Sequence, residues 1–315
     1  MSVAFTFPGQ GSQVVGMGKG LAEAFPSARA VFDEVDEALG QKLTEIIWHG
    51  AEADLTLTEN AQPALMAVSL AAFRVLQDEA GLDLRRHAAF VAGHSLGEYS
   101  ALAAAGAITI ADTARLLRVR GRAMQEATPV GTGAMAALLG LDFPEAAALA
   151  EAAADGEVCQ AANDNAPGQV VISGAKSAVE RAVALAKDRG ARRAILLPVS
   201  APFHCALMAP AAEVMREALD KVRVEAPSVP LIANVSAGPI RDPAVIRRCL
   251  VEQVTGTVRW RESVAYMAGQ GVTRLVEVGA GKVLSGLVKR IASGVDAVSV
   301  GTPEDVAAFV ATMKS

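Results

Sequence analysis

Short apolar runs alternate with longer amphipathic runs over most of this chain. Apolar runs bounded by turn residues are typical of buried strands, whereas apolar positions that recur about every three or four residues are typical of helices. Their alternation predicts an α/β fold with a mainly parallel sheet that helices cover on both faces. The predicted strands are 4–7, 88–92, 231–233, 274–278 and 297–300, and the predicted helices are 28–39, 58–79, 96–105, 110–126, 208–222, 243–253, 258–268, 282–291 and 303–313.

The pattern changes between residues 133 and 197. Predicted strands and helices follow in the order β-α-β-β-α-β, which is that of a compact ferredoxin-like subdomain. The strands are 134–139, 158–162, 169–173 and 194–197, and the helices are 144–154 and 177–188. We predict a tight inner turn at Asn163–Gly168 and crossings between subdomains at 128–131 and 198–202. This division gives a main domain of residues 1–127 and 201–315 and an inserted subdomain of residues 128–200.

Length and composition allow one large domain that carries an insertion. Of the 315 residues, 52% are hydrophobic and 20% are charged, and a net charge of −5 argues against a general nucleic-acid binder. The scattered Cys159, Cys205 and Cys249 fit a reducing compartment without structural zinc. No basic leader segment and no apolar run long enough for a bilayer stands out. We therefore expect a soluble cytoplasmic protein.

The segment Gly93-His94-Ser95-Leu96-Gly97 joins a predicted strand to a predicted helix. A serine on a strained strand-to-helix turn needs neighbours without side chains, so that the backbone bends tightly and exposes the hydroxyl. The free N–H of Leu96 at the helix start is placed to stabilise an oxyanion. A serine that only caps the helix is the alternative. The strand-turn-helix context favours a nucleophile.

Two further glycine-rich turns follow predicted strands. The glycines on either side of Gln10 let backbone amides approach a ligand, which suits a second oxyanion donor, although such a turn is more often only a turn. The turn at 279–282 ends in Gly-Lys, but it lacks the following Ser or Thr and the upstream glycine spacing of a phosphate-binding loop. We therefore reject ATP binding.

One of four histidines is the best partner for Ser95. His204 lies in a loop bounded by prolines, where catalytic side chains concentrate on a rigid scaffold. His94 adjoins Ser95, but successive residues of an extended segment point in opposite directions. His87 and His49 lie in segments typical of surface or packing residues. Elimination therefore favours His204.

Arg120 lies on a mostly apolar stripe of the predicted helix over 110–126, whereas Arg115, Arg118 and Arg122 are predicted to face solvent. A buried arginine usually pairs with a carboxylate, which favours a structural partner within the protein. A substrate carboxylate is the more specific alternative, because a planar guanidinium can donate two parallel hydrogen bonds to a carboxylate.

Together these segments resemble the malonyl-CoA:acyl-carrier-protein transacylases of fatty-acid synthesis, a family that includes the acyltransferase domains of polyketide synthases. The resemblance covers essentially the whole chain. It rests on Gly9–Gln13, Gly93–Leu102, Arg120–Gly121, Asn163 with Asn165–Gln169, His204–Met208, and Glu277–Gly279 with Gly281–Leu284. Each segment alone is modestly specific, and all of them in this order are highly specific.

The resemblance implies a fold and a set of catalytic residues. Discrete enzymes of the family have an α/β-hydrolase-like domain with an inserted ferredoxin-like subdomain. Ser95 would be acylated, His204 would be its base, and the amides of Gln10 and Leu96 would form the oxyanion hole. Gln253 falls at the position whose backbone carbonyl holds the histidine, in agreement with the lack of a persuasive third acid.

The resemblance also implies how substrate is bound. Arg120 would bind the malonyl carboxylate, which reverses the preference for a structural partner. Asn163 and Asn165 are further candidates for substrate contacts. The ring of Phe203 would crowd a substituent on the malonyl α-carbon, which favours malonyl over methylmalonyl.

The expected reaction moves a malonyl group from malonyl-CoA to the phosphopantetheine thiol of acyl carrier protein. We expect a monomer with no permanently bound cofactor, no metal, no nucleic acid and no membrane. Two basic clusters are candidates for carrier docking or for ordinary solvated faces: Arg189 with Arg192 and Arg193, and Lys289 with Arg290. The alternatives are an acyltransferase that serves a polyketide synthase, a serine hydrolase or thioesterase, and a catalytically silent docking module. The long segment after His204 disfavours a hydrolase.

Overall fold

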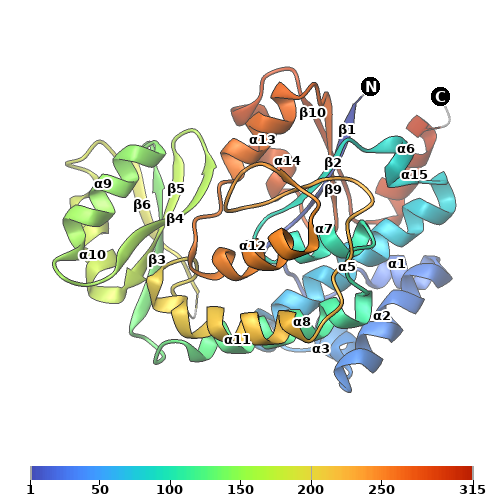
Figure 1. Ribbon diagram of the computed structural model, residues 1–315, viewed down its shortest axis with the longest axis horizontal. Helices are drawn as coiled ribbons and strands as arrows, with labels where there is room; N and C mark the ends of the chain where they lie inside the picture. The colour runs from blue at the N-terminus through green and yellow to red at the C-terminus, as the bar shows by residue number, and fades with distance from the viewer. Residues whose placement is uncertain (1, 200, 314–315) are drawn as a thin grey trace.

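The structure is a computed structural model that describes residues 2–199 and 201–313. Its larger sheet has the strand order β10-β9-β1-β2-β7-β8 (Figure 1). The first five of these strands pair in parallel, and only β8 runs antiparallel to its neighbour β7. The strands are β1 (Val3–Phe7), β2 (Phe90–Gly93), β7 (Leu231–Ile232), β8 (Pro239–Ile240), β9 (Arg274–Val278) and β10 (Asp296–Val300).

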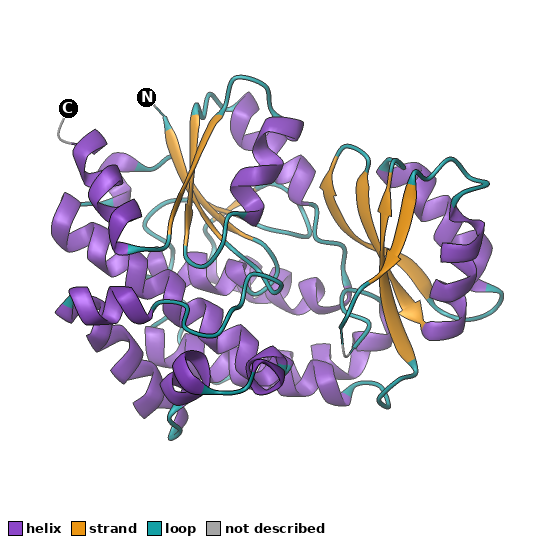
Figure 2. Ribbon diagram, turned by 180° about the vertical axis from the view of Figure 1, so that it is seen from behind, coloured by secondary structure: helices purple, strands orange, loops and turns teal. Residues whose placement is uncertain are grey.

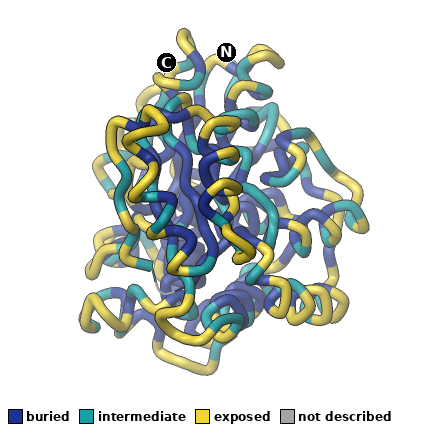
Figure 3. Tube along the Cα trace, turned by 90° about the vertical axis from the view of Figure 1, so that its left-hand side faces the viewer, coloured by how far each residue is buried: buried dark blue, intermediate teal, exposed yellow. Residues whose placement is uncertain are grey.

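Both faces of this sheet are buried, because side chains of successive residues leave opposite faces of a strand. Phe5 and Phe7 of β1 belong to one hydrophobic cluster, whereas Ala4 belongs to another. Val91 and Ala92 of β2 divide in the same way. The strands therefore form a buried centre beneath more exposed helices and loops (Figure 3).

Helices enclose the sheet and extend one side of it into a thick layer. The long helices α5 (Thr58–Ala80), α8 (Ile110–Glu126) and α2 (Pro26–Leu39) pack on one another. The remaining helices of the main domain are α1 (Lys19–Ala24), α3 (Leu43–His49), α4 (Glu52–Thr56), α6 (Leu84–His87), α7 (Gly97–Ala104), the 3-10 turn η1 (Ala206–Met208), α11 (Ala209–Asp220), α12 (Pro243–Thr255), α13 (Trp260–Gly269), α14 (Val283–Ile291) and α15 (Pro303–Met313).

A second, antiparallel sheet has its own hydrophobic cluster. Its order β4-β5-β3-β6 and its chain order β-α-β-β-α-β are those of a ferredoxin-like unit. Both of its helices lie on one face (Figure 2). The elements are β3 (Gly133–Leu139), α9 (Phe143–Ala154), β4 (Cys159–Ala166), β5 (Gln169–Ala175), α10 (Lys176–Ala186) and β6 (Arg193–Leu196). The boundaries at residues 128 and 200 stay predictions, and residue 200 itself lies outside the described residues.

Edge strand β4 ties the small sheet to the main domain. The Val258 N–H donates to the Ala162 carbonyl at 2.9 Å, and the Asp164 N–H donates to the Val258 carbonyl at 2.9 Å. The Asp164 carboxylate is buried and pairs with Arg261 at 2.8 Å. These contacts explain why the predicted turn at Asn163–Gly168 is wrong. Its polar residues continue the strand to Ala166, and only Pro167 and Gly168 turn.

The prediction that Arg118 faces solvent is also wrong. Arg118 is not fully solvated, because only 14% of its side chain is exposed and it donates to Asn60.

Within residues 2–199 and 201–313, every helix is too short or too polar to traverse a bilayer.

The turn between β2 and α7 leaves no room for side chains at its two glycines. A Cβ on Gly93 would lie 1.9 Å from the Gly97 carbonyl carbon, and a Cβ on Gly97 would lie 2.2 Å from the Phe7 carbonyl oxygen. Both contacts are with backbone, which cannot rotate away. The glycines therefore allow the elbow to pack directly on the end of β1.

Replacing Gly97 with Ala is expected to lower the free energy of unfolding by more than about 2 kcal/mol, because backbone must shift to admit the methyl group. Gly286→Ala is the matched control, since a Cβ there meets nothing within 4 Å and the residue lies inside α14. That change should stabilise by about 0.5–1 kcal/mol. Urea unfolding measures both, and a Gly97→Ala midpoint equal to that of the unsubstituted protein would contradict the packing argument.

Candidate active site

Ser95 occupies a strained backbone conformation at the carboxyl end of β2. Its φ of 53° lies in the left-handed region that side chains disfavour. Asn234, which follows β7 and is almost fully buried, holds the turn. Its Oδ1 accepts from the Ser95 N–H at 2.8 Å, and its Nδ2 donates to the Gly93 carbonyl at 2.7 Å. The strain therefore persists because a neighbouring strand end holds both sides of the turn.

His204 lies between the Ser95 hydroxyl and the backbone of Gln253. The distance from Ser95 Oγ to His204 Nε2 is 2.8 Å, and that from His204 Nδ1 to the Gln253 carbonyl oxygen is 2.8 Å. A carbonyl oxygen only accepts, so Nδ1 carries the hydrogen of the neutral ring. Nε2 is then free to accept from the Ser95 hydroxyl. This arrangement is that of a nucleophile and its base.

The surroundings of His204 keep its ring neutral. Burial first, and then the positive charge of Arg120, lower its pKa to about 3, against the hydrogen bond to Gln253. At neutral pH the ring can therefore take a proton. Protonation would be transient, because the protein does not stabilise the imidazolium in the resting site.

Arg120 is buried beside the same hydroxyl, with a relative exposure of 1%. Its Nη1 donates to Gln62 Oε1 at 2.7 Å, and its Nη2 donates to Gln253 Oε1 at 2.8 Å and to Ser95 Oγ at 3.1 Å. In the part of the chain described, Arg120 forms no ion pair with Asp or Glu, and its Nε has no hydrogen-bond partner. Neutral amide oxygens therefore hold Arg120 in place of the structural carboxylate that its burial alone had favoured.

The two segments that carry the candidate oxyanion donors touch each other. A Cβ on Gly9 would lie 2.7 Å from the His94 carbonyl oxygen, so the Gly9–Gln10 turn packs on the elbow. Leu96 is the N-cap of α7, where backbone N–H groups lack helical partners. Across residues 2–199 and 201–313, neither the Gln10 nor the Leu96 N–H has an acceptor. Their role in an oxyanion hole stays a prediction.

The other candidate residues lie around this centre. His94 turns away from Ser95 as predicted, and its Nε2 lies 2.8 Å from Asn165 Oδ1. Asn163 is buried in β4, next to Val258. Phe203 is 8% exposed and belongs to the larger hydrophobic cluster. Substrate contacts of Asn163, Asn165 and Phe203 stay predictions.

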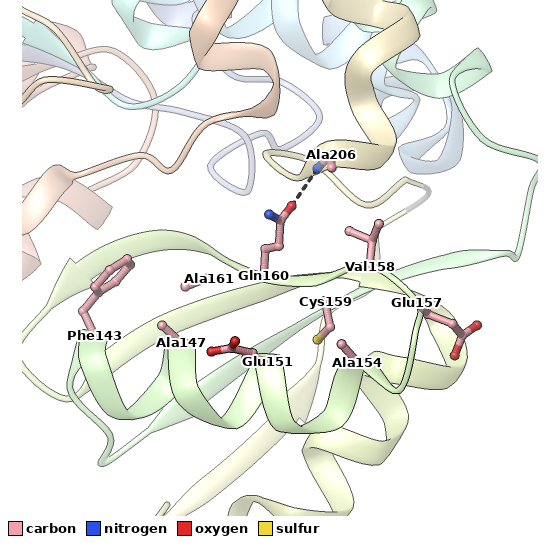
Figure 4. Close-up of a pocket in the computed structure, with 10 residues that line it drawn as sticks. All are labelled: Phe143, Ala147, Glu151, Ala154, Glu157, Val158, Cys159, Gln160, Ala161 and Ala206. Carbon is pink, nitrogen blue, oxygen red and sulfur yellow. Dashed lines mark hydrogen bonds between the residues drawn. The ribbon is translucent and has the colours of Figure 1, made fainter.

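An open groove of about 500 Å³ lies between α9, β4 and the segment after His204 (Figure 4). Gln160 reaches from β4 to this segment, and its Oε1 accepts from the Ala206 N–H at 2.8 Å. Ser95 and Arg120 do not line the groove. Gln160 therefore braces the segment that carries His204 from the side of the small sheet.

A family model described as an acyl transferase domain matches residues 4–314. The chain belongs to the acyl transferase family. A malonyl CoA-acyl carrier protein transacylase of Bacillus subtilis (strain 168) is 47% identical over 313 residues, which cover 99% of this chain and 97% of that protein. The chain is therefore an acyltransferase, and the resemblance noted from its motifs is confirmed.

Solved structures of acyl transferases share the fold. The acyl-carrier-protein-S-malonyltransferase of Bartonella henselae has a TM-score of 0.97 and 56% identity, with 100% of both chains covered. A malonyl-transacylase solved in complex with a type II polyketide synthase acyl-carrier protein has a TM-score of 0.95 and 42% identity, and covers 99% of this chain and 100% of that chain. The predicted α/β-hydrolase-like fold with an inserted subdomain is thus confirmed.

Two residues of this acyl transferase site lie outside the motifs that predicted it. Asn234 bonds both sides of the elbow, and Gln62 accepts from Arg120. Asn234 comes directly after a predicted strand, at the sheet edge where ligands bind in open α/β folds, which is a usable signal. Gln62 is a polar residue within a buried helix, but nothing in the sequence links it to the distant Arg120.

The reactivity of Ser95 is expected to stay flat between about pH 8 and pH 5, because His204 remains neutral over this range. An imidazole with an ordinary pKa of about 6.5 would lose roughly thirtyfold of its neutral form by pH 5. The rate of covalent labelling by a fluorophosphonate probe, followed by intact mass, measures this reactivity. Ser95→Ala controls for labelling elsewhere. A fall in rate centred near an ordinary histidine pKa would contradict the neutral, buried ring.

Proposed function

We propose that this acyltransferase moves the malonyl group of malonyl-CoA to the phosphopantetheine thiol of acyl carrier protein through a malonyl-serine intermediate. The observation that carries the proposal is the buried guanidinium of Arg120, 3.1 Å from the Ser95 hydroxyl and without an ionic partner among the described residues. A carboxylate at the far end of a short acyl group would supply that partner. Relatives that bear the name of this activity support the same substrate.

In the first half-reaction, the Ser95 oxygen attacks the thioester carbonyl of malonyl-CoA while His204 Nε2 takes the hydroxyl proton. The carbonyl oxygen becomes an oxyanion, which the N–H groups of Gln10 and Leu96 stabilise. The C–S bond then breaks, and His204 returns the proton to the departing CoA thiolate. The product is a malonyl ester on Ser95.

In the second half-reaction, the carrier thiol gives its proton to His204 and attacks the ester carbonyl. A second oxyanion forms and collapses, the C–O bond to Ser95 breaks, and His204 returns the proton to Ser95. In this mechanism, His204 carries each transferred proton, and backbone N–H groups of the same chain stabilise each oxyanion. We therefore propose a monomer that needs no bound cofactor. Its three free, buried cysteines fit the reducing cytoplasm.

Fatty-acid synthesis is the pathway we propose, and a carrier protein of polyketide synthesis is the second candidate. The solved complex of a similar malonyl-transacylase with a polyketide carrier supports the second candidate, because the chemistry is the same for both carriers. Of the two basic clusters, the one at Lys289 and Arg290 belongs to the main domain and contacts the small subdomain. Arg290 donates to the Pro167 carbonyl at 2.7 Å. Docking there stays a prediction.

Brief mixing with malonyl-CoA is expected to add one malonyl mass to the protein, located on Ser95. Addition of pantetheinylated carrier protein should then move that mass to the carrier thiol. Intact mass of both proteins, with peptide mapping, measures each step. Adduct loss as free malonate without transfer would favour a hydrolase, and absence of any adduct would favour a silent docking module.

Arg120→Ala is expected to lower malonyl transfer by about 100-fold or more relative to acetyl transfer, because only malonyl loses a charge-assisted hydrogen bond to its carboxylate. The ratio of kcat/KM for the two CoA thioesters measures the effect. Arg122→Ala is the control, since Arg122 lies on the same helix with 60% of its side chain exposed. Equal losses with both thioesters would refute the assignment of Arg120.

A further inference from the structure

A buried carboxyl group lies directly behind the reacting residues, and the proposed mechanism does not use it. Glu98, in the first turn of α7, has a relative exposure of 0%. Its Oε2 accepts from Gln253 Nε2 at 2.6 Å and from the Asn234 N–H at 3.2 Å. Its Oε1 has no hydrogen-bond partner among the residues described. Burial of a carboxyl group costs free energy of folding unless hydrogen bonds or an ionic partner offset the loss of water.

Glu98 and the Ser95 carbonyl together fix the orientation of the Gln253 side chain. The amide nitrogen of Gln253 donates to Glu98 Oε2 and, at 3.0 Å, to the Ser95 carbonyl. A backbone carbonyl cannot donate, so the NH₂ end of the amide must face these two oxygens. The Oε1 end is thereby turned toward Arg120, from which it accepts at 2.8 Å. A flipped amide would present N–H groups to a guanidinium that only donates.

Gln253 links this orientation to both halves of the site. Its side-chain oxygen accepts from the guanidinium of Arg120, and its main-chain carbonyl accepts from His204 Nδ1. Because one residue makes both contacts, a rotation of its side chain removes support from Arg120 directly. The main-chain contact to His204 changes less on such a rotation, because Gln253 lies within α12 and the helix holds its backbone.

We propose that Glu98 is a positioning residue for acyl-group selection: held by the Asn234 N–H, it keeps the Gln253 amide in the orientation that aims the Arg120 guanidinium at the substrate carboxylate. The inference rests on the proposed malonyl transfer, since it concerns how that substrate is chosen. Glu98 does not touch substrate and acts only through Gln253 and Arg120. Its loss should therefore change selectivity between malonyl and acetyl groups.

The hydrogen bond, rather than the charge, performs the positioning. Burial raises the pKa of the Glu98 carboxyl to about 7, while hydrogen bonds from Gln253 and Asn234 and the charge of Arg120 oppose the rise. Both protonation states are thus accessible near neutrality. In each of them Oε2 can accept from Gln253. A neutral side chain of the same length should therefore retain much of the function.

Three substitutions of Glu98 separate the effect of its side-chain length from the effect of its charge. Glu98→Ala removes the acceptor and is expected to lower the malonyl-to-acetyl ratio of kcat/KM by about 10- to 100-fold, the loss expected for a hydrogen bond that holds a charged group. Glu98→Gln keeps the reach and should stay within about threefold of the unsubstituted ratio, by the same scale. Glu98→Asp keeps the charge but is one methylene too short, so it should lose selectivity like Glu98→Ala.

Ser100→Ala is the matched control. Ser100 lies on the same helix, is fully buried, and its hydroxyl has no partner among the described residues. Thermal unfolding of each variant separates instability from altered selectivity, and Ser100→Ala should keep the unsubstituted ratio. If Glu98→Ala does not fold, the comparison of Glu98→Gln with Glu98→Asp decides the question.

Several results would overturn the proposal for Glu98. These are an unchanged ratio in both Glu98→Ala and Glu98→Asp, equal losses of malonyl and acetyl transfer, or a Glu98→Gln ratio no better than that of Glu98→Asp. Failure of the unsubstituted protein to form the malonyl adduct is a different result. That outcome would reject the proposed function itself, whereas normal transfer with unchanged selectivity in the variants rejects only the role of Glu98.

Discussion

The burial of the Arg120 guanidinium beside the Ser95 hydroxyl is the constraint on which the site depends. Arginine stays protonated, so its charge must be accommodated wherever the chain places it. Two amide oxygens, from Gln62 and Gln253, take part of its donor capacity without cancelling its charge. The resting site therefore holds an incompletely satisfied cation, which an arriving carboxylate would complete. In the proposed function this site would discriminate against uncharged acyl groups, because they leave the guanidinium without an ionic partner.

The fold explains how groups that are distant in the sequence reach this point. Ser95 follows one strand of the parallel sheet and Asn234 follows the adjacent strand, so the carboxyl ends of β2 and β7 hold the two sides of the elbow. The Gly9–Gln10 turn follows β1, the other neighbour of β2. His204 comes from the segment after the small sheet, which Gln160 braces. The carboxyl ends of neighbouring strands thus fix Ser95, the proposed nucleophile, while the small sheet supports His204, its proposed base.

Periodicity predicted most of the fold because burial on both faces of the sheet leaves a strong apolar signal. The bounds of β9, α8 and α15 agree with those predicted. Prediction failed where tertiary contacts replaced local preference. Asn163 and Asp164 have turn-forming side chains, yet backbone pairing with Val258 and the Arg261 ion pair hold them in a strand. The partners of Arg120 could not be predicted either, since an amide oxygen from a distant helix has no sequence pattern that marks it.

The backbone carbonyl that orients His204 fits the same electrostatics. If a carboxylate took the place of the Gln253 carbonyl, it would stabilise the imidazolium and raise the pKa of His204. It would also supply Arg120 with a permanent counter-ion. A backbone carbonyl orients the ring through Nδ1 without adding a charge. The nearby carboxyl group of Glu98 has a pKa raised to about 7 by burial and bonds to the Gln253 amide, so it neutralises the guanidinium only in part. The proposed neutral base and the proposed substrate-binding cation thus depend on one arrangement, in which a backbone carbonyl holds His204 and side-chain amides hold Arg120.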